Sequence, residues 1–299
     1  MPVKNRLREG AKFLLLCCPM FFSSCALAAE PPGMASLQAK HSALSFKLAN
    51  NHYARALYIE STDADNRLHS DLYAELNFPL SDFRSLLKDQ QHWCDVLLLN
   101  IYSKSCRTYT SPIGDSRVAV NVGSKEFQEL DKTYSLDFEY KTAENAETYF
   151  DVLLFADNGP LGTSNYAMRL QGLALNGNTS FVHLSYSYSY SMWANLAMQT
   201  YLTTLGRGKV GFTELGNATE PSYINGSRGV LERNTMRYFL ALDAYLASQS
   251  LAPADPFESR LAHWFAATQA YPRQLNDLDL SSYLSIKRRE YRRMINLNR

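Results

Sequence analysis

The feature that most constrains the fold is a long series of segments in which apolar and polar side chains alternate. A period of two is typical of β-strands, because successive side chains point to opposite faces of a sheet. The tight Asn176-Gly177-Asn178 sequence between the last two segments is typical of a hairpin turn. We therefore predict a large antiparallel sheet, with strands at 96–107, 117–122, 133–140, 149–155, 164–175 and 179–190.

Shorter patterns flank this sheet on both sides. Leu37, Leu44 and Leu48 recur at helical spacing after a Pro31-Pro32-Gly33 sequence that we interpret as a linker. A hairpin follows at 56–61 and 68–76, and a helix begins near Pro79 and ends at 91–93. After residue 190 the pattern predicts helices at 191–204, 231–248, 257–270 and 280–296. A Gly-rich stretch at 206–216 includes a strand-like segment at 209–212. The fold class is α+β.

The first 29 residues have the pattern of a secretory signal peptide. Basic residues at 4, 6, 8 and 12 precede an apolar run at 13–22, and Ala26-Leu27-Ala28 is an A-x-A cleavage pattern. Pro19 interrupts the apolar run, which is shorter than the about 20 residues of a spanning helix. We expect a secreted or periplasmic protein that begins near Ala29 or Glu30. A lipid-modified Cys25 is the alternative.

Removal of the signal leaves two cysteines, Cys94 and Cys106. In an oxidising compartment such a pair most simply forms one disulfide. In the chain-entropy model, closure of so short a loop stabilises the fold by about 3 kcal/mol. The alternative is that Cys94 acts as a nucleophile assisted by His92.

Composition and motifs exclude several classes of function. Without residues 1–29 the chain has 26 basic and 28 acidic residues, so it lacks the basic footprint of a nucleic-acid-binding protein. It has no G-x-S-x-G or H-E-x-x-H motif, and the Gly-rich 206–211 lacks P-loop spacing. The six histidines lack metal-ligand spacing. We predict no catalytic residue, no metal and no cofactor.

The order of these elements resembles the helix-grip fold of the START and Bet v 1-like superfamily. In that fold a curved antiparallel sheet wraps a long C-terminal helix around an apolar cavity. The resemblance covers roughly residues 35–250. It implies a START-like domain at 30–250, a helical extension at 251–299 packed on that domain, and a cavity that takes up a lipid or other apolar small molecule. The superfamily also includes cyclases and hydrolases.

Two neighbouring strands carry the residues that we expect to line this cavity. Alternation places Tyr186, Tyr188 and Tyr190 on one face of their strand, and Tyr166 and Met168 on one face of the strand before it. A tyrosine offers an apolar ring and a hydroxyl, which suits a mostly apolar ligand with a polar end. Ordinary core packing explains the same pattern. Arg169 could orient a ligand, or it could be a solvated strand residue.

The start of the 231–248 helix concentrates charge, with Glu232, Arg233 and Arg237 within six positions. Arginine binds carboxylate and phosphate in bidentate fashion, so this cluster could face the head group of a ligand. A structural role for Glu232 is the alternative.

The last helix carries Lys287, Arg288, Arg289, Arg292 and Arg293 against Glu290 alone. Such a helix could contact an anionic membrane surface peripherally, where each basic residue contributes about 1 kcal/mol. A solvated terminal helix packed on the domain explains the same residues.

Three functions follow from these patterns. The first is an exported START-like protein that binds an apolar small molecule. The second is a hydrolase or cyclase of the same fold that uses Glu232, His183 or Asp151 as acid or base. The third is an envelope interaction protein with an exposed apolar patch.

Overall fold

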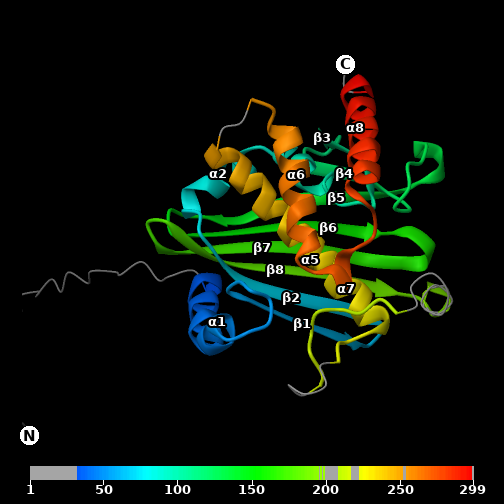
Figure 1. Cartoon of the computed structure of the whole chain (residues 1–299). Coiled ribbons are helices and arrows are strands. Elements are labelled where there is room, and N and C mark those ends of the chain that lie inside the picture. Colours follow the sequence, from blue (N-terminus) through cyan, green and yellow to red (C-terminus); the bar gives the residue numbers. More distant parts are fainter. Residues whose placement is uncertain are drawn as a thin grey trace, which may run out of the picture. The chain divides into compact units, whose positions relative to one another are not determined.

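The computed structural model describes residues 32–194, 196, 198, 208–216, 222–251 and 254–297. The predicted signal peptide at 1–29 lies outside these residues. The described strands form one antiparallel sheet in the order β1-β2-β8-β7-β6-β5-β4-β3 (Figure 1). The strands are β1 (Leu57–Ala64), β2 (Arg67–Leu76), β3 (Ser103–Thr110), β4 (Ser116–Val122), β5 (Tyr134–Asn145), β6 (Tyr149–Asn158), β7 (Thr163–Asn176) and β8 (Thr179–Tyr190).

Helices precede, interrupt and follow the strands. The local sequence explains why α6 begins where it does: the Asp255 side chain accepts a hydrogen bond of 3.1 Å from the Glu258 N–H, and Pro256 occupies the first helical position. The helical segments are α1 (Pro32–Ala49), η1 (Leu80–Phe83), α2 (Arg84–Lys88), α3 (Gln91–Leu97), η2 (Leu130–Lys132), η3 (Pro160–Gly162), α5 (Gly226–Leu251), α6 (Pro256–Gln269), α7 (Pro272–Leu275) and α8 (Leu280–Leu297).

The sheet is completed by a pairing between distant parts of the sequence. β8 is the strand predicted at 179–190, and it pairs with β7 across the predicted turn. On its other side β8 pairs with β2, where Leu72 lies opposite Leu184. The N-terminal hairpin β1–β2 thus extends the meander that runs from β3 to β8.

Alternation along the strands produces two separate cores, one on each face of the sheet. Val182 and Leu184 of β8 belong to the larger core under α5. Phe181, on the opposite face of β8, packs with Tyr73 of β2 in a smaller core under α1. The predicted helical stripe of α1 is buried there, with Leu37, Leu44 and Leu48.

The helix that packs across the sheet is α5. Its Met236, Phe239, Leu240 and Tyr245 are fully buried, and it contacts β1, β2 and β8. α6 lies along α5, where Trp264 Nε1 donates a hydrogen bond of 3.0 Å to the Arg237 carbonyl. Figure 1 shows α5 and α6 lying over one face of the sheet. The fold is therefore the expected α+β helix-grip, an antiparallel sheet with a long helix across it.

The predicted strand at 96–107 is wrong in its first half. Residues 91–97 form α3 and the strand begins only at Ser103. Val96, Leu97, Leu98 and Leu99 are all buried. A continuous apolar run has no periodicity that separates a buried helix from a buried strand. Packing of α3 against α5 and β3 selected the helix.

Three smaller predictions are also corrected or left outside the described residues. Pro32 and Gly33 belong to the first turn of α1, not to a linker, in keeping with the preference of proline for a first helical turn. Residues 209–212 form no strand, although the Gly211 N–H donates to the Ile224 carbonyl at 2.6 Å. Of the helix predicted at 191–204, the described residues 192–194, 196 and 198 are helical. The remainder of that prediction lies outside the described residues.

Candidate ligand-binding cavity

A cavity of about 500 Å³ lies between the first half of α5 and the strands β7 and β8. It is open to solvent, and its wall also includes the β6–β7 connection and the turns that precede β3 and follow β4. Binding sites for small molecules commonly measure about 300–1,000 Å³. The described residues that line it are Tyr102, Gly123, Ser124, Pro160, Leu161, Thr163, Tyr166, Tyr188, Ala194, Met198, Val230, Arg233, Asn234 and Arg237.

The sheet side of the cavity is an aromatic wall. The rings of Tyr166 and Tyr188 are stacked, with centroids 5.0 Å apart and planes 17° apart. The Tyr166 hydroxyl donates to Thr163 Oγ1 at 2.9 Å, whereas the Tyr188 hydroxyl has no hydrogen-bond partner among the described residues. Only 7 % of Tyr188 is exposed, and burial raises the pKa of its hydroxyl. The wall is apolar apart from the hydroxyl groups of Thr163, Tyr166 and Tyr188.

The helix side of the cavity is polar, because Arg233, Asn234 and Arg237 occupy the inward face of α5. The Arg237 guanidinium donates to Asn234 Oδ1 at 3.1 Å and to Asp277 Oδ2 at 2.5 Å. Arg233 Nη1 donates to the Val210 carbonyl at 3.1 Å. The two walls therefore differ in chemistry: aromatic on the sheet and cationic on the helix.

Three other strand residues predicted to bind a ligand, Met168, Tyr186 and Tyr190, lie on the cavity face of the sheet but at different depths. Met168 and Tyr186 are paired across β7 and β8, and both are packed in the main core. The Tyr186 ring meets Tyr238 of α5 edge-on, with centroids 5.6 Å apart. Tyr190 borders a small pocket next to the cavity, and its hydroxyl donates to Asp63 Oδ1 at 2.6 Å. Tyr166 and Tyr188 are thus the predicted strand residues that line the main cavity.

Glu232 is placed away from the cavity, so the prediction that it binds a ligand is corrected. The residue is fully buried, and its carboxylate accepts hydrogen bonds from Ser61 Oγ, from the N–H groups of Phe212 and Thr213, and from Thr213 Oγ1 at 2.5–2.8 Å. A carboxylate whose acceptor sites are filled in this way holds backbone in place. Glu232 ties residues 212–213 and β1 to α5.

Arg169 is also corrected, because it lies on the opposite face of the sheet. Its guanidinium pairs with the Asp151 carboxylate in bidentate fashion. Gln171 of the same face donates to the Tyr149 hydroxyl at 2.7 Å, and its Oε1 lies 2.9 Å from His183 Nδ1. The alternation of β7 directs these side chains away from α5.

The acid–base residues of the enzyme hypothesis are likewise outside the cavity. His183 and Asp151 belong to the opposite face of the sheet, and Glu232 is enclosed by its four hydrogen-bond donors. His183 Nε2 lies 2.7 Å from Asp71 Oδ1. None of the three can reach a molecule bound between α5 and the tyrosine wall, so that form of the hypothesis is not carried forward.

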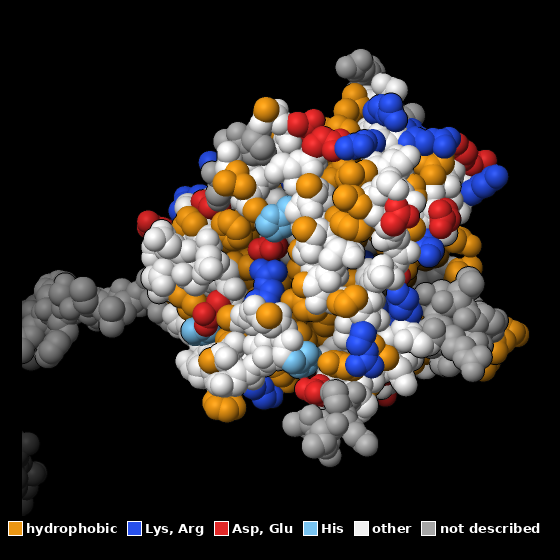
Figure 2. All heavy atoms as spheres, in the orientation of Figure 1, with side chains coloured by type: hydrophobic (Ala, Val, Ile, Leu, Met, Phe, Trp, Pro, Cys, Tyr) orange, Lys and Arg blue, Asp and Glu red, His pale blue; other side chains and the backbone are white. Residues whose placement is uncertain are grey.

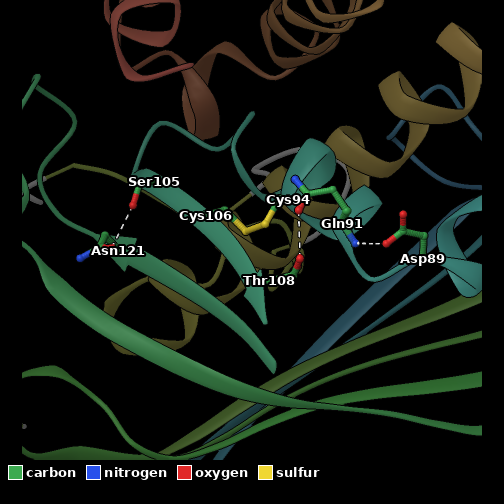
Figure 3. Close-up of a disulfide and its surroundings, with 7 residues drawn as sticks. All are labelled: Asp89, Gln91, Cys94, Ser105, Cys106, Thr108 and Asn121. Atoms are coloured by element: carbon green, nitrogen blue, oxygen red, sulfur yellow. Dashed lines mark hydrogen bonds between the residues drawn. A yellow bond between two sulfur atoms is a disulfide. The ribbon is translucent and has the colours of Figure 1, made fainter. Parts of the chain in front are cut away.

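Cys94 and Cys106 form a disulfide between α3 and β3, with Cα atoms 5.2 Å apart (Figure 3). Beside it, Thr108 Oγ1 donates to Gln91 Oε1 at 2.9 Å across the same two elements. Because both sulfurs are bonded, Cys94 has no thiol to serve as the nucleophile that we considered. The disulfide prediction is confirmed.

The inward face of α8 includes two residues that we had counted as surface charges. Lys287 and Glu290 are fully buried, and Glu290 accepts from Lys287 Nζ at 2.8 Å and from Lys104 Nζ at 3.0 Å. Burial lowers the pKa of Lys287 to about 8. The exposed Arg288 pairs with Glu258 at 2.7 Å, and Figure 2 shows basic and acidic side chains side by side over α8.

The described residues include neither a metal-ion cluster nor a membrane-spanning helix. No group of three or more His, Cys, Asp or Glu side chains is arranged to hold a metal ion. No helix within the described ranges has the length and apolar character needed to cross a bilayer.

Sequence reasoning missed several residues of the cavity wall. Tyr102 and Ser124 come from turns beside β3 and β4, and Leu161 comes from the β6–β7 connection. Such residues carry no periodic signal. Asn234 was within reach of sequence reasoning, since it lies beside Arg233 and one turn before Arg237.

No protein-family model matches the chain, and no curated protein matches it. Solved structures do resemble it. A START superfamily protein from Mycobacterium smegmatis aligns at 12% identity over 46% of this chain and 91% of its own, with a TM-score of 0.31. The ZhuI aromatase/cyclase from Streptomyces sp. R1128 aligns at 9% identity over 69% and 95%, with a TM-score of 0.33.

The lipid transfer and protein localization domain of human StarD13 aligns at 8% identity over 45% of this chain and 71% of its own, with a TM-score of 0.32. The chain's own strand order and the helix α5 across the sheet establish the fold. No activity is carried over from the similar structures.

Proposed function

We propose that this protein is exported and binds an apolar small molecule in the cavity between α5 and the strands β7 and β8. The observation that supports this function most directly is the stacked pair Tyr166 and Tyr188, which forms one wall of an open cavity of about 500 Å³. A stacked aromatic wall buries a large apolar area and positions flat or extended molecules. A binding pocket for an apolar molecule needs only a few polar groups in its wall.

Two features support export. Residues 1–29 have the charge and hydrophobicity pattern of a secretory signal. The Cys94–Cys106 disulfide is compatible with an oxidising compartment. Intact-mass measurement of the protein recovered from outside the cytoplasm of its own host tests this part. We expect a mass that begins near Ala29 or Glu30, and a mass that includes residues 1–29 would contradict cleavage.

Native mass spectrometry with organic extraction tests the binding function. We expect wild-type protein purified from its own host to carry a small apolar molecule. Val230→Trp places a large ring on the cavity face of α5 and should abolish this binding. Ile113→Trp is the matched control, since Ile113 is 83 % exposed in the β3–β4 turn.

The supporting and contradicting outcomes differ in which proteins carry a bound molecule. A bound molecule in wild type and in the Ile113→Trp variant, but not in the Val230→Trp variant, supports the proposal. A wild-type protein that carries no molecule and takes up no apolar fluorescent probe would overturn it.

A further inference from the structure

We propose that the ligand is amphipathic and carries an anionic head group, held at the α5 wall by Arg237 together with Arg233 and Asn234. Its apolar body would then lie against Tyr166 and Tyr188. This inference rests on the proposed function and specifies the class of ligand.

The charge of the cavity wall is the first reason. The described lining residues include two arginines and no carboxylate. Both arginines are almost completely buried, with Arg233 4 % and Arg237 2 % exposed. Burial of a guanidinium is costly unless its charge is compensated. Asp277, which is not among the described lining residues, compensates the charge of Arg237. The two arginines give the cavity wall a positive character, which favours an anionic end on the ligand.

The hydrogen bonds of Arg237 are the second reason. A guanidinium has five N–H donors, and the described partners of Arg237 use one on Nη1 and one on Nη2. Its Nε is buried without an acceptor. Its carboxylate partner is also shared, because Asp277 Oδ1 lies 3.4 Å from Lys209 Nζ. Arg237 therefore has donor capacity that the described protein groups leave unfilled.

The geometry of α5 places these donors together. Arg233 and Arg237 are four residues apart, so they lie one above the other on the same helical face. Asn234 lies between them and already accepts from Arg237. The Arg237 guanidinium also lies over the Tyr102 ring, 5.2 Å from its centroid, which holds its plane in position. Planar guanidinium groups arranged in this way can donate paired hydrogen bonds to two oxygens of a carboxylate or phosphate.

The opposite wall determines the rest of the ligand. Tyr166, Tyr188, Leu161 and Met198 provide its apolar surface. The Tyr188 hydroxyl is the polar group of the tyrosine stack that has no partner among the described residues. A ligand that satisfies both walls has one anionic end and an apolar body. Fatty acids and single-chain phosphates have this chemistry, and so does the phosphate of a two-chain lipid.

A head-group series measured on the wild-type protein is the direct test, because it needs no variant that might misfold. The assay is displacement of an apolar fluorescent probe at fixed pH and salt. The competitors share one alkyl chain and differ in the head: a carboxylate, a phosphate, a methyl ester, an alcohol and a trimethylammonium. We expect the two anions to bind at least tenfold more tightly than the three others.

Further arms of the experiment distinguish the source of the anion. Phosphatidic acid tests a two-chain lipid, and tighter binding of a single-chain competitor would assign the site to single-chain ligands. Inorganic phosphate tests whether the head group binds by itself. The tightest of these competitors identifies the natural source of the anionic head.

Variants then locate the head-group site. Arg237→Gln should weaken binding of the anions at least tenfold and leave the methyl ester within twofold. Arg233→Gln is the second variant, in case the loss of the Asp277 pair unfolds the first. Arg169→Gln is the matched control, because it removes an ion-paired arginine from the opposite face of the sheet. Circular dichroism and thermal unfolding confirm that each variant is folded.

Failure of this inference differs from failure of the proposed function. If the ester and alcohol bind as tightly as the anions, the protein binds apolar molecules and the head-group inference is overturned. If folded Arg237→Gln and Arg233→Gln both keep wild-type anion affinity, the assigned site is wrong. If none of the competitors displaces the probe and the probe itself does not bind, the proposed function fails as well.

Discussion

The Cys94–Cys106 disulfide leads to a quantitative prediction about stability. The two cysteines are 12 residues apart and join α3 to β3, next to the turn that supplies Tyr102 to the cavity. In the chain-entropy model, a loop of this length restricts the unfolded chain by about 3 kcal/mol. For a domain of this size, that loss corresponds to a decrease in Tm of about 6–12 °C.

The perturbation is the double substitution Cys94→Ala/Cys106→Ala, compared with wild type in urea and thermal unfolding. We expect the double variant to lose about 3 kcal/mol. It should keep its fold, since Thr108 and Gln91 still connect the same two elements.

Dithiothreitol provides the internal control. It should lower the stability of wild type to that of the double variant and leave the double variant unchanged, while intact mass confirms reduction. If wild type, shown to be fully reduced, unfolds at the same urea concentration as the oxidised protein, the bond does not stabilise the fold and the reasoning is refuted.

Two further predictions concern charged groups away from the cavity. Burial opposes ionisation of Asp71, but hydrogen bonds with His183 and His69 outweigh it and hold the pKa of Asp71 well below its usual range. A depressed pKa contributes stability at pH values above the unfolded pKa of about 3.9, and that stability is lost as the pH falls below it. In the Asp71→Asn variant, the midpoint of urea unfolding should therefore change less between pH 6 and pH 3 than it does in wild type. An equally steep pH dependence in the variant would contradict this. Glu290→Gln should cost about 3–5 kcal/mol in urea unfolding at pH 7, because it leaves Lys104 and Lys287 buried without their carboxylate. Lys287→Met should cost much less, because the Lys104–Glu290 pair remains, and equal losses for the two variants would count against the explanation.

The amino-acid sequence by itself determined most of the strands and the face to which their side chains point. The predicted 179–190 is β8 to the residue, and Tyr166, Met168, Tyr186 and Tyr188 face α5 as alternation requires. The physical reason is local, because a side-chain period of two depends only on neighbouring residues. The pairing of Cys94 with Cys106 was predictable because no other cysteine lies after residue 29.

Only the tertiary structure decided what the charged residues do. Glu232 and Arg237 are five residues apart on one helix, yet one is enclosed by Ser61, Phe212 and Thr213 and the other lines the cavity. Their roles depend on partners that arrive from distant elements. The apolar run at 96–99 also depends on distant elements. It forms the end of α3 and the turn after it, because α3 packs against α5 and β3. Alternation is a property of the chain, whereas the surroundings of a buried charge are a property of the folded molecule.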